Sequence, residues 1–416
     1  MTHTVQTGAV SPDADRRLPP PVFCLGFRPF FLLGAIWALV AIALWLAALS
    51  GALAIGGPYG ALGWHAHEMI YGFAAAILAG FLLTAVPGWT MQPKLGAGGL
   101  AALAALWVAG RFVMASADIV GVPAAAAIDL LFLVLVLART ASQIVASRNW
   151  RSLPIAAAPA VLLGGNLLFH LGAAGFVQTS GLENRLGIAV YVFLVATIGG
   201  RIIPTFTRNW LKKRAAAGTM PPDASRFDVG VVLVTLATLV LWVSSPEGPI
   251  LAATATVAAS GHLARLLRWK GLRTGSEPLV WILHVAYAWM PVSFCLVAAA
   301  AYDPVTVPGS AVVHALTAGV ITTMMFAIMT RATLGHTGRP LIADRWTTAA
   351  YVMIVGAAVC RVSAALLDSL YMHLLTCSGL LWVSAFFIYL ASYGPKLLGE
   401  PWAVSAAGAP AAAPPS

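Results

Sequence analysis

The stretch that decides the fold runs from Trp64 to Pro87 and reads WHAHEMIYGFAAAILAGFLLTAVP. After Glu68 it is almost wholly apolar over the ~20 residues that a helix needs to cross a ~30 Å hydrocarbon core. Only a helix satisfies the backbone of such a single segment inside a membrane. Two imidazoles and a carboxylate at its start are costly there, and such groups usually mark ion paths, proton relays or cofactor sites. The segment therefore predicts a membrane helix with a functional group at one end.

Composition extends this prediction to the whole chain. Of its 416 residues, 60% are hydrophobic and 9% are charged, which is too little charge to cover a soluble protein. The net charge of +10 does not indicate a nucleic-acid partner, because the basic residues lie in short loops between apolar segments. Lipid is the expected surrounding.

Apolar segments of spanning length recur along the chain, so we predict an all-α, polytopic integral membrane protein of about twelve transmembrane helices. They are expected at 29–53, 64–87, 98–117, 122–146, 153–178, 185–208, 226–244, 249–268, 279–300, 309–334, 346–367 and 370–395. These helices form a single domain over 21–398. The flanking tails, 1–20 and the Ala/Pro-rich 399–416, are expected to be disordered.

Loop charges predict the orientation. Basic clusters follow every second span, for example Lys212 to Arg214 after the sixth, and Arg185 is the single minor exception. Because basic loops stay in the cytoplasm, we expect both termini to be cytoplasmic and the chain to cross its membrane twelve times.

Histidines gather at one predicted depth. On this topology five of them lie in the outer half of the membrane: His65, His67, His170, His314 and His373. Each alone could be a hydrogen-bonded core residue. Together they predict a metal or haem site, because neutral imidazole is the commonest metal ligand and haem iron requires an axial ligand in a dry pocket.

Three further histidines lie elsewhere on this topology. His262 and His284 are placed in the inner half, and His336 lies just beyond span ten at the cytoplasmic face.

The His65-Ala66-His67 spacing leaves two readings open. If a helix contains both residues, the rings lie roughly 200° apart around it and serve different centres, or one centre and one structural bond. If His65 lies in the preceding loop, both could bind one small ion such as copper. Glu68 is the candidate catalytic residue, as a proton donor, but it could also support an imidazole or favour the helix start.

Three arginines within apolar spans need partners: Arg111, Arg201 and Arg361. They could pair with Glu68 and Asp129, or bind the carboxylates of a cofactor such as haem.

The four cysteines form no CxxC or CxxCH motif. This spacing argues against a c-type haem, a zinc ribbon and a disulfide framework. Cys295, Cys360 and Cys377 lie in apolar spans and are expected to be packing residues.

Several motifs, in order along the chain, resemble the NnrS family. They are GFRPFF (26–31), WHAHEM (64–69) with Gly72-Phe73, the stretch 200–211, and HALTAG (314–319) leading to LGHTGR (334–339). The likeness runs from span one to span twelve. It implies an inner-membrane protein of the bacterial nitric oxide response, often associated with denitrification, that contains haem b and copper.

Motif by motif, the resemblance marks His65, His67, His314 and His336 as the strongest ligand positions, followed by His170 and His284. It implies nitric oxide as ligand or substrate. The protein could be an oxidoreductase of nitric oxide reductase type, reducing NO to N2O at a haem/copper site with electrons from quinol or a partner protein. It could instead be a non-catalytic NO-binding or metal-handling protein, or a proton-coupled transporter.

Overall fold

The computed structural model describes residues 20–400, and over this range it contains helices and no strand. The predicted tails fall almost wholly in residues 1–19 and 401–416, which lie outside the described part of the chain.

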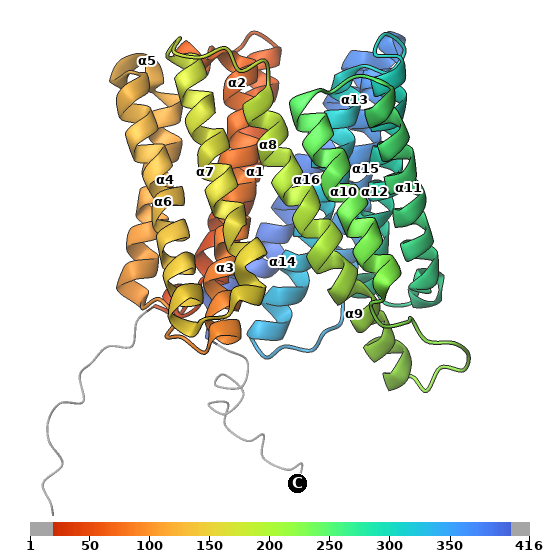
Figure 1. Ribbon diagram of the computed structural model, residues 1–416. Helices are drawn as coiled ribbons and strands as arrows, with labels where there is room; N and C mark the ends of the chain where they lie inside the picture. Colours follow the sequence, from red (N-terminus) through yellow and green to blue (C-terminus); the bar gives the residue numbers. More distant parts are fainter. Residues whose placement is uncertain (1–19, 401–416) are drawn as a thin grey trace, which may run out of the picture.

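Within residues 20–400, twelve helical segments are long and apolar enough to cross a membrane, as predicted. They run roughly parallel in one bundle (Figure 1). Their helices are α1 (Phe27–Leu49), α2, η3 and α3 (Gly60–His67, Glu68–Ala74, Ala75–Thr90), α4 (Ala97–Ala115), α6 (Val122–Ser147), α7 (Leu153–Ala173), α8, η5 and α9 (Leu182–Leu194, Val195–Gly199, Gly200–Lys213), α10 (Arg226–Ser244), α11 (Pro249–Arg268), α12 (Pro278–Tyr302), α13, η7 and α14 (Gly309–His314, Ala315–Thr322, Thr323–His336), α15 (Arg345–Leu366) and α16 (Tyr371–Leu398).

Short helices complete the fold: η1 (Pro21–Phe23), η2 (Gly57–Tyr59), α5 (Ala117–Val120), η4 (Trp150–Ser152), η6 (Gly271–Thr274) and η8 (Asp368–Leu370). The end of the bundle at which α5 and α13 lie, at the top of Figure 1, is called the α5 end below, and the opposite end, where α9 lies, the α9 end.

The boundary between the first two spans differs from the prediction. The first span ends at Leu49, and the second begins with η2 and α2, upstream of Trp64. Gly56 and Gly60 allow this turn, because their φ angles of 92° and 67° lie in the left-handed region that side chains disfavour. Both His65 and His67 are therefore inside helix α2.

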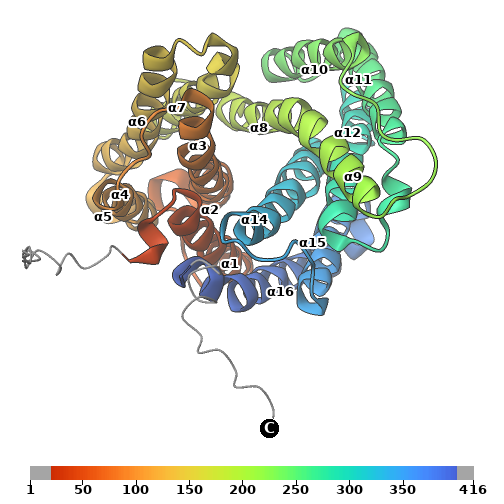
Figure 2. The same cartoon turned by 90° about the horizontal axis from the view of Figure 1, so that it is seen from below.

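The second and tenth spans are the most buried. Within one 18-residue apolar window of each span, 78% and 72% of the residues are buried in these two, against 28–56% in the other ten. Figure 2 shows α14, the second half of the tenth span, enclosed by α1, α12, α15 and α16. Polar groups on these two spans are thus shielded from lipid by neighbouring helices.

Three spans contain a π-helical segment: η3, η5 and η7. Such segments are rare and often lie at functional sites, because the wider turn leaves backbone groups free and re-aims side chains. Segment η3 begins directly after His67, and η7 directly after His314. The two most buried spans are therefore irregular directly after His67 and His314, two of the predicted ligand positions.

The buried Arg28 joins the two ends of the described chain. Its Nη1 donates to the carbonyl oxygens of Pro21 at 3.1 Å, Leu397 at 3.2 Å and Gly399 at 2.7 Å. The last carbonyls of a helix lack partners within the helix, so Arg28 caps α16 while it anchors α1. This contact gives the GFRPFF motif a structural role.

A second buried arginine uses a carbonyl in η5. Arg265 Nη1 donates to the Ala196 carbonyl at 2.9 Å and to the Tyr287 hydroxyl at 2.7 Å, and its Nε donates to Asp228 at 3.1 Å. The guanidinium lies directly against Gly200, where a Cβ atom would lie 1.8 Å from Nη2. Gly200 is therefore required by the space that Arg265 occupies.

We expect Gly200→Ala to lower the stability of the protein by about 1–3 kcal/mol, since it displaces a buried arginine from its acceptors. The matched control is Gly230→Ala on α10, where an added Cβ meets no atom within 4 Å. Alanine there should leave stability unchanged or raise it. Thermal unfolding of the two variants in detergent makes the comparison, and equal midpoints would contradict the assignment.

Candidate metal and cofactor sites

The two histidines of helix α2 face different surroundings, which selects the first of the two readings of their spacing. His67 is fully buried and lies among residues of α6 and α7, whereas His65 lines a cavity bounded by α1, η7, α15 and α16. The helical angle between them thus separates two sites. We call these the ion cluster (His67, Glu68, Arg111, Asp129, Asn166 and His170) and the apolar cavity.

Arg111 holds the two carboxylates of the ion cluster. Its Nη1 donates to Glu68 Oε2 at 2.6 Å, and its Nη2 donates to Asp129 Oδ1. All three side chains are buried. Gly72 makes room for them, because a Cβ there would lie 2.5 Å from Arg111 Nη1. Arg111 thus pairs with carboxylates of the protein, which is one of the two kinds of partner that the sequence left open, the other being the carboxylates of a cofactor.

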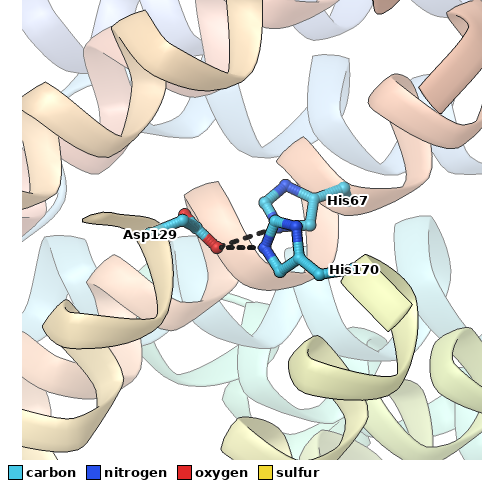
Figure 3. Close-up of side chains that lie close together, drawn as sticks. All are labelled: His67, Asp129 and His170. Atoms are coloured by element: carbon cyan, nitrogen blue, oxygen red, sulfur yellow. Dashed lines mark hydrogen bonds and ion pairs between the residues drawn. The ribbon is translucent and has the colours of Figure 1, made fainter. Parts of the chain in front are cut away.

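Two histidines converge on the same carboxylate (Figure 3). Asp129 Oδ2 lies 3.1 Å from His67 Nε2 and 3.3 Å from His170 Nε2, and it accepts a 2.6 Å bond from Asn166. The remaining nitrogen of each ring is also held. His67 Nδ1 lies 3.0 Å from Glu68 Oε1, and His170 Nδ1 lies 2.9 Å from the Tyr59 hydroxyl.

The geometry of this triad fits a metal ion. The ligand atoms of His67, Asp129 and His170 all lie within 4.8 Å of one another. Metal–ligand bonds of about 2.0–2.1 Å place neighbouring ligands of a tetrahedral site about 3.3 Å apart, close to the separations of Asp129 Oδ2 from the two imidazole nitrogens. Glu68 and Tyr59 contact the Nδ1 atoms of the two imidazoles, as groups that orient metal-bound imidazoles usually do.

The charge of the ion cluster also favours a bound cation. Glu68 and Asp129 carry two negative charges against the single positive charge of Arg111. A buried excess charge is costly, so a bound cation or a proton on His67 is needed to offset it. The cluster can therefore hold a metal ion.

The apolar cavity has a volume of about 340 Å³ and is lined by residues of six spans, including α2 and η3 of the second. Its walls are mainly aliphatic and aromatic, with Phe73 and Trp382 among them. The titratable side chains that line it are His65, His314, Arg361 and Tyr191. Segments from both of the most buried spans thus meet at one cavity.

Hydrogen bonding fixes the ring of His314. Its Nδ1 lies 2.7 Å from the carbonyl oxygen of Ser310, which can only accept, so Nδ1 carries the proton. The lone pair is then on Nε2, the arrangement usual for a metal-ligating imidazole. His65 is held by stacking on Trp45, with ring centroids 4.5 Å apart and planes inclined by 15°.

Three polar atoms beside the cavity are buried without a hydrogen-bond partner in residues 20–400: His65 Nδ1, Asn184 Oδ1 and Arg361 Nη1. Such atoms are rare in folded proteins and usually mark a missing water, ion or ligand. All three residues line the cavity. A ligand with an apolar body, a group for imidazole and an anionic group for arginine would satisfy two of them, and a hydrogen-bond donor would satisfy the Asn184 oxygen.

Other residues predicted for the site lie apart from both centres. His284 Nε2 is 2.8 Å from the Thr207 hydroxyl, and its ring abuts Gly271. His336, the last residue of α14, packs against Phe27 with centroids 5.4 Å apart. Both lie toward the α9 end, and Arg201 on α9 is exposed.

His262 makes hydrogen bonds through both ring nitrogens. Its Nδ1 is 2.8 Å from the Tyr287 hydroxyl, and its Nε2 is 2.9 Å from the Thr235 hydroxyl. It is a satisfied core histidine.

The sequence motifs do not point to two members of the ion cluster, Asp129 and Asn166, nor to Tyr59 beside it. The sequence offers Asp129 only as a partner for an arginine, and it gives no indication for Asn166 or Tyr59. The available signal was Asp129 itself, an acidic residue within the apolar segment 122–146. Nothing in the sequence showed that α6 and α7 would bring these side chains against α2.

The helices and the two buried sites define a polytopic α-helical membrane protein with a polar interior at one end of the bundle. The family model described as NnrS protein matches residues 21–400, so the chain belongs to the NnrS family. The resemblance seen in the motifs is thereby confirmed. A search of curated proteins gives no match.

We expect Arg111→Gln to destabilise the protein by about 3–5 kcal/mol, because it leaves two carboxylates buried without a cation. Arg201→Gln is the matched control, since Arg201 also lies in a spanning segment but is exposed. It should change stability by less than about 0.5 kcal/mol. The yield of folded protein after size-exclusion chromatography, with its unfolding temperature, is the measurement. Similar losses in both variants would refute the role given to Arg111.

Proposed function

We propose that the protein is a haem- and copper-binding membrane protein that binds nitric oxide in the bacterial response to that gas. Membership of the NnrS family suggests the nitric oxide response. The observation that carries the proposal is the convergence of His65, His314 and the unpartnered Arg361 on one apolar cavity.

The apolar cavity is the proposed haem site. His65 and His314 would supply imidazole to the iron, and Arg361 would bind a propionate, since guanidinium pairs with carboxylates through two parallel hydrogen bonds. Haem iron, once bound, supplies a centre that binds NO. The protein excludes water with the aliphatic and aromatic wall, and an apolar membrane interior also concentrates a small neutral gas.

The ion cluster is the proposed copper site. Imidazole nitrogens suit copper, and copper binds more tightly to such ligands than the other first-row divalent metals. His67, His170 and Asp129 would hold the ion, while Glu68 and Tyr59 orient the imidazoles.

Binding of NO is favoured over its reduction to N2O. Reduction needs two NO molecules in one space, yet His65 and His67 face different sites on opposite sides of α2. Glu68, the candidate proton donor, is held by Arg111 and His67 and is not among the residues that line the cavity. Its proposed role is to position His67.

Reduction is therefore the second candidate, with quinol or a partner protein as electron donor. We also propose the bacterial inner membrane as the location, with both termini in the cytoplasm. Support for this orientation comes from the basic loops, such as Lys212 to Arg214 at the α9 end.

The haem assignment predicts that His65→Ala and His314→Ala remove most of the Soret absorption of the purified protein, because each removes an imidazole from the cavity. His284→Ala is the matched control and should keep the band, since His284 is also buried but lies at the Thr207 contact. Addition of NO should shift the Soret band of the wild type. Full Soret absorption in both cavity variants would disprove the site.

The copper assignment predicts that His170→Ala lowers the copper content of the protein while its Soret absorption persists. His336→Ala should lower neither, since His336 packs only at the α9 end. Elemental analysis of copper and iron per protein chain separates the two sites. If copper remains at the wild-type level in His170→Ala, the ion cluster is a purely structural network.

A further inference from the structure

Two cysteines 17 positions apart in the sequence lie side by side on the outside of the bundle. Cys360 on α15 and Cys377 on α16 have their sulfur atoms 3.7 Å apart, and both thiols are free. The helices are fixed side by side at this level, where the Ser378 hydroxyl donates to the Ala357 carbonyl at 2.8 Å. The expectation that Cys295, Cys360 and Cys377 are packing residues is wrong for Cys295 and Cys377, which are both exposed.

The Cys377 thiol is exposed on the outside of the bundle, and the half-buried Cys360 thiol lies beside it, on two helices long and apolar enough to span a membrane. Large apolar side chains around them are turned outward, with exposed fractions of 48% for Val359, 56% for Met372 and 59% for Leu380. Each cysteine lies six residues from the α5 end of its helix, which corresponds to about 9 Å along the axis. A reagent that reaches the pair must therefore be soluble in the hydrocarbon.

We propose that Cys360 and Cys377 are a redox-active dithiol that a membrane quinone oxidises to a disulfide. Sulfur atoms in van der Waals contact need only small side-chain movements to bond. Quinones are two-electron oxidants that partition into the hydrocarbon, where the exposed Cys377 thiol lies.

The reaction balances within this pair of reactants. Two S–H bonds break and one S–S bond forms between Cys360 and Cys377. The two electrons and two protons released pass to the quinone, whose two carbonyl oxygens become the hydroxyls of the quinol. No metal takes part, so the proposal is independent of the haem and copper sites.

The disulfide would act on the wall of the apolar cavity. Arg361 directly follows Cys360, and Ser378 directly follows Cys377, and both line that cavity. A covalent bond between the helices would fix their separation beside Arg361. The redox state of the quinone pool would thereby influence the helix separation beside the apolar cavity.

The experiment uses the full-length protein in liposomes, reduced and then incubated with ubiquinone-1. The ring of this quinone is fully substituted, so thiols cannot add to it in place of being oxidised. Remaining thiols are counted by the mass shift after labelling with a maleimide-polyethylene glycol in denaturant. We expect four labelled thiols to fall to two, with about one quinol formed per chain, and a reductant to restore all four.

Matched variants locate the reaction. Cys360→Ser and Cys377→Ser should each keep all three remaining thiols after quinone treatment, whereas Cys24→Ser with Cys295→Ser should lose both of its two. Cys295 is an informative reference because it is also exposed on a spanning helix. The serine variants replace an exposed or half-buried thiol and should fold, which their elution profile checks.

Three outcomes would overturn the proposal. In the first, all thiols remain reactive after quinone treatment. In the second, the Cys360→Ser and Cys377→Ser variants lose as many thiols as the wild type does. In the third, labelling is blocked before any oxidant is added and is restored by a Cu(I) chelator, which would make the pair a soft-metal site.

Discussion

The guanidinium of Arg111 holds together the part of the protein on which both sites depend. It bridges Glu68, which begins the π-helical segment η3, and Asp129 on α6. An ion pair in this position stabilises the fold little relative to an apolar core, but its loss would leave buried charge. It therefore specifies how α2 and η3 sit against α4 and α6. That placement sets the direction of both His67 and His65, since the two rings share one short helix.

The π-helical segments explain how polar side chains reach the backbone of the second and sixth spans. A regular helix would keep every carbonyl in its own ladder, whereas the irregular segments free some backbone groups for side chains from other helices. In η5 the Ala196 carbonyl accepts from Arg265, and in η3 the Gly72 carbonyl accepts from Trp107 at 3.1 Å. Glycine is essential beside these bonds, because Gly72 and Gly200 lie directly against the two guanidinium groups.

Much of the fold followed from the sequence, and a smaller part of the site did. Twelve apolar segments of spanning length predicted twelve helices, because hydropathy and helix length are set by the membrane. The histidine cluster at one depth was predicted in part: His65 and His314 share the cavity, and His67 and His170 share the ion cluster. The sequence could not divide these four between two sites, because the start of α2 depends on turns at Gly56 and Gly60 rather than on hydropathy.

By itself, then, the sequence determined the class of protein, the number of spans, the family and the candidate ligands, since these depend on composition, period and motif. Only the tertiary structure decided which side chains meet. It placed Asp129 between His67 and His170, left Arg361 facing a cavity, and brought Cys360 to Cys377 across 17 positions of chain. The physical reason is that helix–helix packing sets these distances. Packing depends on the shape of many small contacts, and no local spacing in the chain records it.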